Sequence, residues 1–164
     1  MKKPITKETK KKLLDGHFSH EVKMLIEGRT YFKPRPSDPR ILDVTGKDLE
    51  AFLVHIRILY EFFYKSGNDD LAHADHYILA WKVKNPLKNI DYWNVQINKY
   101  LSHLTYTRVT GARGKHPYYL YPAGVLYNHF RYLTIEFFDQ LPSEYMTSNL
   151  ENLYVDLVKA PFPY

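Results

Sequence analysis

The stretch from Lys47 to Lys65 limits the folds open to this chain more than any other part of its sequence. It contains LEAFLVHIRILYEFFY, which is apolar on nearly all sides when wound as an α-helix. Only Glu50, Arg57 and Glu61 form a narrow polar stripe along it. Such a helix needs neighbours around most of its circumference and is usually central in a bundle. The sequence therefore predicts a helical bundle built around residues 47–65.

Several other segments have the periodicity or the end signals of helices. Between Thr6 and Thr30, apolar residues fill one arc when each residue turns the helix by about 100°. The connection from Lys33 to Thr45 is expected to be extended, because it holds Pro34, Pro36 and Pro39. The expected helices are 6–30, 47–65, a short piece reaching Trp81, 90–109, 122–140, and a last helix opened by a capping box at Ser148–Glu151. We expect a single all-α domain, residues 1–164, with about five helices in a bundle.

The positive charge of the chain is concentrated at its N-terminus. Residues 1–12 hold six lysines and Glu8, a net charge of +5, so the 17 basic and 17 acidic residues of 13–164 balance to zero. The body of the domain therefore lacks the overall basic charge of many nucleic-acid-binding domains. The lysine-rich segment is either a solvated end or an arm that binds phosphates.

The residue types that are absent exclude several functions. There is no cysteine, which excludes disulfides, thiolate metal sites and cysteine nucleophiles and favours a cytoplasmic location. No apolar run reaches the length of a membrane helix, and no apolar stretch follows the basic N-terminus as in a signal peptide. The sequence lacks GxSxG, GxGxxG and GxxxxGK[ST] motifs, so no cofactor is expected.

Three residues are predicted to be buried polar groups. Glu21 lies near the centre of the apolar arc of the first helix, His17 is one turn before it on the same face, and His55 lies on the apolar second helix. A buried carboxylate needs a hydrogen-bond or ionic partner, so we predict that Glu21 pairs with Arg, Lys, His or Tyr from another segment. The pair is either structural or part of a functional site. A mononuclear metal site from His17, Glu21, His55 and His103 is an alternative, but no established ligand spacing occurs and we predict no tight transition-metal site.

The segment INKYLSHLTYTR, residues 97–108, is the most distinctive stretch of the chain. It places Asn98, His103 and Arg108 on one predicted helix, with His103 about 100° from its apolar arc. INKYLSH resembles the signature of the HEPN family, which is an Arg, a polar residue, a few further residues and a His. Asn98 and His103 match the polar residue and the His, and Ile97 stands where the family has Arg.

The resemblance implies a function as well as a fold. HEPN domains are small α-helical bundles, and many cut RNA as toxins or in phage defence, using the Arg and His at a dimer interface. The resemblance therefore implies that this chain is associated with nucleic acid in a defence or toxin–antitoxin context. If the chain is an enzyme, the resemblance implies a metal-independent ribonuclease. His103 would be the base and Asn98 its polar neighbour, in a polar pocket or subunit seam. Because Ile97 replaces the Arg, the cation would have to come from Arg57 or Arg108; Arg57 is also spaced for an ion pair with Glu61.

A basic loop, TGARGKHPYYLY, adds a candidate nucleic-acid contact. It combines Arg113, Lys115 and His116 with Tyr118, and cations beside aromatic rings can hold a phosphate chain and stack bases. An exposed loop packed on its tyrosines explains the same residues. Two other functions remain open: a non-enzymatic helical protein that binds a protein partner or a second copy of itself, and a metal-binding bundle.

Overall fold

The central helix expected from the sequence is α3, Gly46–Tyr64, in a computed structural model that describes residues 5–67, 71–102 and 121–162. Its N-cap is Thr45, whose hydroxyl accepts a hydrogen bond from the Asp48 N–H at 3.1 Å. It contacts α2, α4 and α6. Seven of its side chains are buried: Phe52, Leu53, Ile56, Leu59, Tyr60, Phe62 and Phe63. The prediction of a helical bundle built around this segment is confirmed.

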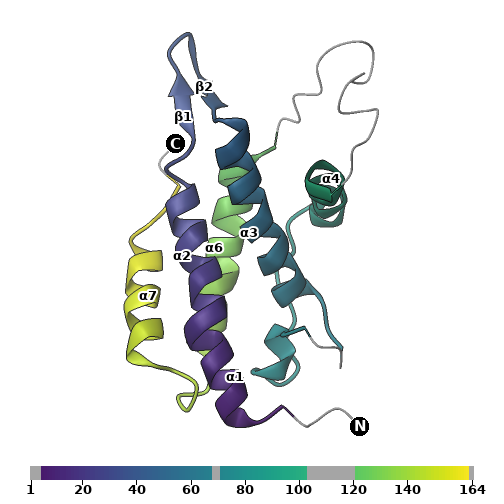
Figure 1. Cartoon of the computed structure of the whole chain (residues 1–164), viewed down its shortest axis with the longest axis vertical. Coiled ribbons are helices and arrows are strands. Elements are labelled where there is room, and N and C mark those ends of the chain that lie inside the picture. The colour runs from purple at the N-terminus through teal and green to yellow at the C-terminus, as the bar shows by residue number, and fades with distance from the viewer. Residues whose placement is uncertain (1–4, 68–70, 103–120, 163–164) are drawn as a thin grey trace.

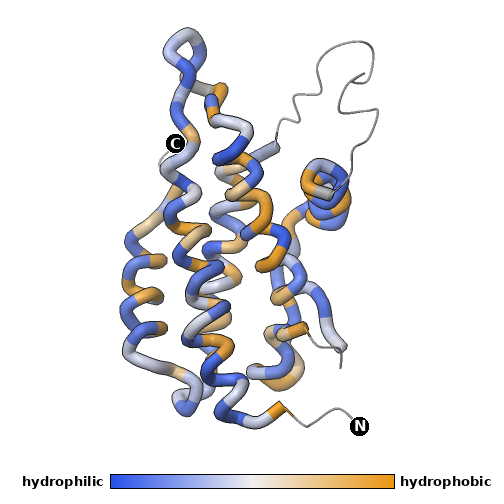
Figure 2. The backbone as a smooth tube through the Cα atoms, in the orientation of Figure 1, coloured by the Kyte–Doolittle hydropathy of each residue, from blue (hydrophilic) through white to orange (hydrophobic). Residues whose placement is uncertain are grey.

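Three further long helical segments pack with α3 along a common axis (Figure 1). They are the N-terminal segment with α1, Lys7–Leu13, and α2, Ser19–Gly28; α6, Ala123–Gln140; and α7, Ser148–Val158. Phenylalanines from three of the four segments meet in the core, with ring centroids 4.4 Å apart for Phe18 and Phe62 and 5.2 Å apart for Phe62 and Phe137. Figure 2 shows hydrophobic and hydrophilic residues alternating along these helices, as expected when one side of each helix is buried.

The N-terminal helix contains a π-helical turn, Leu14–Phe18, between α1 and α2. The sequence predicted one regular α-helix, but a π-turn inserts an extra residue and shifts the faces of the residues within and beyond it. Leu14 and Phe18 are buried, whereas His17 is exposed. The prediction that His17 is a buried polar residue is therefore wrong, because it assumed a constant 100° per residue through this turn.

A β-hairpin replaces the extended connection predicted for Lys33–Thr45. Strand β1, Lys33–Arg35, pairs antiparallel with β2, Asp38–Asp43, with an irregularity between Pro34 and Arg35. Arg35 donates from Nε and Nη2 to one oxygen of Asp43, at 2.9 and 2.7 Å. The prolines do make this region extended, but pairing with a second strand could not be seen from local sequence.

Helix α4, Ile90–Ser102, runs across the bundle and is seen nearly end-on in Figure 1. A hydrogen bond of 2.5 Å from the Tyr60 hydroxyl to Asp91 links α3 to α4. The helical piece predicted to reach Trp81 is only a 3₁₀ turn, Ala74–His76. The segment is held instead by the Trp81 indole, which donates to the Phe63 carbonyl at 3.1 Å.

Helix α7, with its N-cap, begins one residue earlier than the capping box predicted from Ser148. Its N-cap is Thr147, whose hydroxyl accepts from the Leu150 N–H at 3.3 Å, so Ser148 is already inside the helix. The Thr147 hydroxyl also donates to Asp15 in the π-turn, and this tertiary contact favours Thr147 as the cap. Within the described ranges, no helix combines the length and hydrophobicity needed to cross a membrane.

Candidate functional site

Glu21 and His55 form a short hydrogen bond between two neighbouring helices. Oε2 of Glu21, on α2, lies 2.6 Å from Nδ1 of His55, on α3. Their side chains are 16% and 13% exposed, so each is largely but not completely buried. The prediction that Glu21 is largely buried and paired with a residue of another segment is confirmed, and the partner is His55.

The pair leaves one imidazole nitrogen free. An ionised carboxylate can only accept hydrogen bonds, so Nδ1 of His55 is the donor toward Glu21. Nε2 of His55 has no hydrogen-bond partner among the described residues and is not fully buried. A histidine held in this way by a carboxylate presents the lone pair of its other nitrogen as a base. The geometry is therefore suited to removing a proton from a group that approaches from solvent.

A second histidine and an aliphatic surface lie beside this pair. The ring of His20, an exposed residue of α2, lies 5.9 Å from the ring of His55 at an interplanar angle of 78°. On α3, Val54 and Ile58 are 38% and 41% exposed, and both are helical neighbours of His55. Helices α2 and α3 lie side by side in Figure 1, and each contributes one of the two imidazoles. We call Glu21, His55 and His20 the histidine site.

The HEPN-like segment lies only partly within the described residues. Ile97, at the position of the family's Arg, is a core residue with 1% exposure, and Asn98 is partly exposed on α4. His103, in the same signature, lies outside the described residues. The other predicted site residues outside the described ranges are Arg108, Arg113, Lys115, His116 and Tyr118.

The side chain of Arg57 does not join the histidine site. It is one turn before Tyr60, which bonds to α4, and its direction is about 200° around α3 from that of His55. It makes no hydrogen bond or ion pair with any described residue, so the expected ion pair with Glu61 is not formed. Arg57 is partly exposed.

The three described residues of the predicted four-residue metal site, Glu21, His55 and His17, do not all come together. Glu21 and His55 are together, but the π-turn directs His17 into solvent. Across the described ranges, no three His, Asp or Glu side chains are arranged to hold a metal ion. The structure therefore joins two of the four residues considered for a metal site, and His103 lies outside its described part.

Sequence reasoning missed a partly buried tyrosine–histidine pair between α3 and α6. The Tyr64 hydroxyl lies 2.6 Å from Nε2 of His129, and Tyr60 stacks on Tyr64 with ring centroids 5.0 Å apart. Burial raises the pKa of Tyr64 to about 12 and lowers the pKa of His129. Both side chains are therefore held in their neutral forms and use their polar atoms to hydrogen-bond each other. This favours a structural role for the pair. No spacing in the sequence relates the two residues, which are 65 positions apart.

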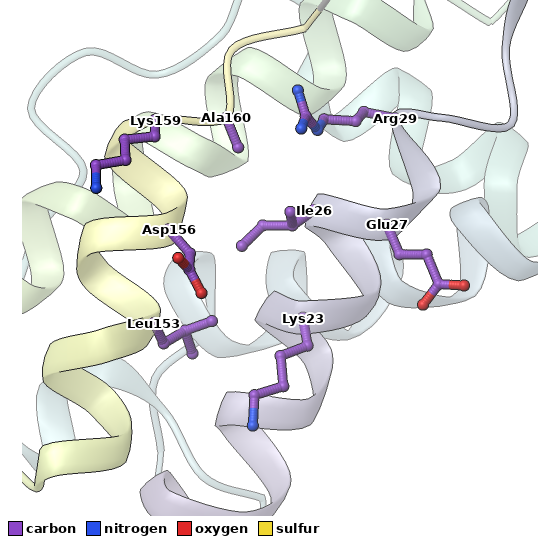
Figure 3. A pocket seen from close by; sticks show the side chains of 8 residues that line it. All are labelled: Lys23, Ile26, Glu27, Arg29, Leu153, Asp156, Lys159 and Ala160. Carbon is purple, nitrogen blue, oxygen red and sulfur yellow. The ribbon is translucent and has the colours of Figure 1, made fainter.

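A groove of about 390 Å³ lies between α2 and α7 (Figure 3). Its lining is Lys23, Ile26, Glu27, Arg29, Leu153, Asp156, Lys159 and Ala160. The two helices run in the same direction, since Lys23 contacts Asn149 near the start of α7 and Arg29 contacts Pro161 beyond its end. Arg29 and Lys159 are the C-cap residues of these helices, where positive charge offsets the helix dipoles. Two of the cations at this groove, Arg29 and Lys159, therefore already have a structural role.

Comparison of the chain with models of known protein families, with curated proteins and with solved structures found no match.

Proposed function

We propose that this protein associates with RNA and cleaves it without a metal ion, with His55 as the general base. The observation that carries the proposal is the hydrogen bond of 2.6 Å from Nδ1 of His55 to Glu21, which leaves Nε2 of His55 without a hydrogen-bond partner among the described residues and not fully buried. Metal-free cleavage of RNA needs a base that takes the proton of the 2′-hydroxyl, and a carboxylate-oriented imidazole is suited to this task.

The choice of RNA as substrate comes from the sequence. The resemblance of residues 97–103 to the HEPN signature supports it, as do the lysines of residues 1–12 and the basic loop with Arg113 and Lys115. In this proposal the protein belongs to a defence or toxin–antitoxin context. His103 is the base that the resemblance favours, whereas His55 is the base that the described geometry favours, so a test must separate the two.

The test is incubation of the full chain with single-stranded RNA in the presence of a chelator. We expect cleavage by the wild type, a loss of at least about 100-fold for His55→Ala, and a smaller loss for Glu21→Gln, which keeps the shape but not the charge of the orienting group. His17→Ala is the matched control, because His17 is an exposed histidine of the same helical segment that does not contact Glu21.

The outcomes distinguish the alternatives. Absence of cleavage by the wild type would overturn the proposal. Cleavage lost in His103→Ala but kept in His55→Ala would support a HEPN-like site and remove His55 from it. Each variant is checked by circular dichroism, so that unfolding is not counted as lost activity.

A second candidate function, a non-enzymatic interaction protein, is favoured by exposed apolar residues on α6 and α7. Val125 and Tyr132 on α6, and Val155 and Val158 on α7, are all exposed, and the two helices are in contact. Exposed apolar side chains that cluster often mark protein interfaces. Analytical ultracentrifugation over a range of concentrations tests self-association. A monomer at all concentrations would refute a homodimer through this surface.

A further inference from the structure

His20 differs from His55 although their rings are neighbours. Its ring is 5.9 Å from that of His55, but its side chain forms no hydrogen bond or ion pair with any described residue and is exposed to solvent. One histidine of the site is therefore oriented by a carboxylate, and the other makes no such bond. An imidazole can serve as a general acid or as a general base near neutral pH.

We propose that His20 is the general acid of the site and that the substrate is an RNA phosphodiester cleaved by its own 2′-hydroxyl. This inference rests on the proposed function. Nε2 of His55 takes the proton of the 2′-hydroxyl as the 2′-oxygen forms a bond to phosphorus. The bond from phosphorus to the 5′-oxygen breaks, and that oxygen receives the proton of the His20 imidazolium. The products are a 2′,3′-cyclic phosphate and a free 5′-hydroxyl, and no further reactant is needed.

The spacing of the two rings fits this reaction. The attacking and leaving oxygens lie on opposite sides of phosphorus, about 3.5 Å apart, and each needs an imidazole nitrogen at about 3 Å. The two nitrogens are then roughly 5–9 Å apart, a range that rings with centroids 5.9 Å apart can satisfy. The two rings also differ in orientation, with planes 78° apart, so they need not compete for one oxygen.

A protonated His20 also provides positive charge near the phosphate. Such charge stabilises the transition state of phosphoryl transfer. In this proposal the imidazolium of His20 supplies that charge as well as the proton for the leaving group.

The test compares two substrates that differ only in how much the leaving group needs a proton. One is the dinucleotide UpA, whose 5′-oxygen is a poor leaving group. The other is uridine 3′-(4-nitrophenyl phosphate), whose phenolate leaves without protonation. We expect His20→Ala to slow cleavage of UpA by about 10²–10⁴-fold and to change cleavage of the nitrophenyl ester by less than about tenfold. His55→Ala should slow both, and His17→Ala should slow neither.

Several results would overturn the inference, and they separate it from the proposed function. Equal losses on both substrates would make His20 a positioning residue, and no loss on either would remove it from the site. In both cases cleavage that depends on His55 would leave the proposed function standing. If the wild type cleaves neither substrate, the proposed function and this inference both fail. Cleavage of the 2′-deoxy dinucleotide, which lacks the nucleophile, would refute the cyclising reaction.

Discussion

Replacing Arg131 with alanine should destabilise the fold more than any other arginine substitution tested below. Arg131 lies on α6 and is 8% exposed. It donates from Nε to the Leu157 carbonyl at 2.8 Å and from Nη2 to the Val158 carbonyl at 2.5 Å. These are carbonyls of the last turn of α7, where intrahelical partners run out, although the Leu157 carbonyl also accepts a hydrogen bond from the Ala160 N–H at 3.2 Å. The arginine therefore joins two helices and caps one of them.

The magnitude follows from these two bonds. A hydrogen bond from a charged donor contributes about 1.5–3 kcal/mol to stability, and a cation at a helix C-terminus adds about 0.3–1 kcal/mol. Water can reach part of the vacated space because α7 ends near the surface, which favours the lower part of the range. We expect Arg131→Ala to lower the free energy of unfolding by about 3–4 kcal/mol. For a chain of this size, Tm should fall by about 6–15 °C.

The measurement is urea unfolding followed by circular dichroism, with two comparison variants. Arg131→Lys keeps the charge but loses the paired donors, so about half of the loss is expected. Arg29→Ala is the matched control, because Arg29 makes one exposed hydrogen bond to the Pro161 carbonyl, at 3.0 Å, and should cost only about 1 kcal/mol. A loss below about 1 kcal/mol for Arg131→Ala, or equal losses at both arginines, would refute the reasoning.

Two further predictions concern the core. Burial raises the pKa of Tyr64 and Tyr77 from 10.0 to about 12 in the folded state. Their contribution to stability is therefore complete below pH 10 and is lost as the pH rises from 10 through 12. Titration of the folded protein by ultraviolet absorbance would contradict this if it found ordinary pKa values for both tyrosines. Gly28→Ala should destabilise by about 1–3 kcal/mol, because the added Cβ would lie 2.9 Å from Cδ2 of the fully buried Phe52. Gly46→Ala, whose Cβ meets nothing within 4 Å, should be neutral or slightly stabilising in the same unfolding assay.

The helical class and the main helices follow from the sequence because their signals are local. The apolar circumference of residues 47–65 predicts a central helix, and α3 has nearly those bounds. Pro122 and the apolar run after it predict the start of α6 correctly to within a residue. The sequence also predicts that Glu21 pairs with a cationic or hydrogen-bond-donating side chain, because an ionised carboxylate in an apolar arc needs such a partner.

Only the tertiary structure decided which residues meet. Nothing in the sequence selects His55 as the partner of Glu21 over other cations and donors, since the pair depends on how α2 packs on α3. A π-turn that inserts one residue into the first helix carried His17 out of the apolar face, and Thr147 replaced Ser148 as a cap through its bond to Asp15. Periodicity describes the faces of a regular helix, whereas the energy of packing between helices determines where a helix departs from regularity and which polar groups become neighbours.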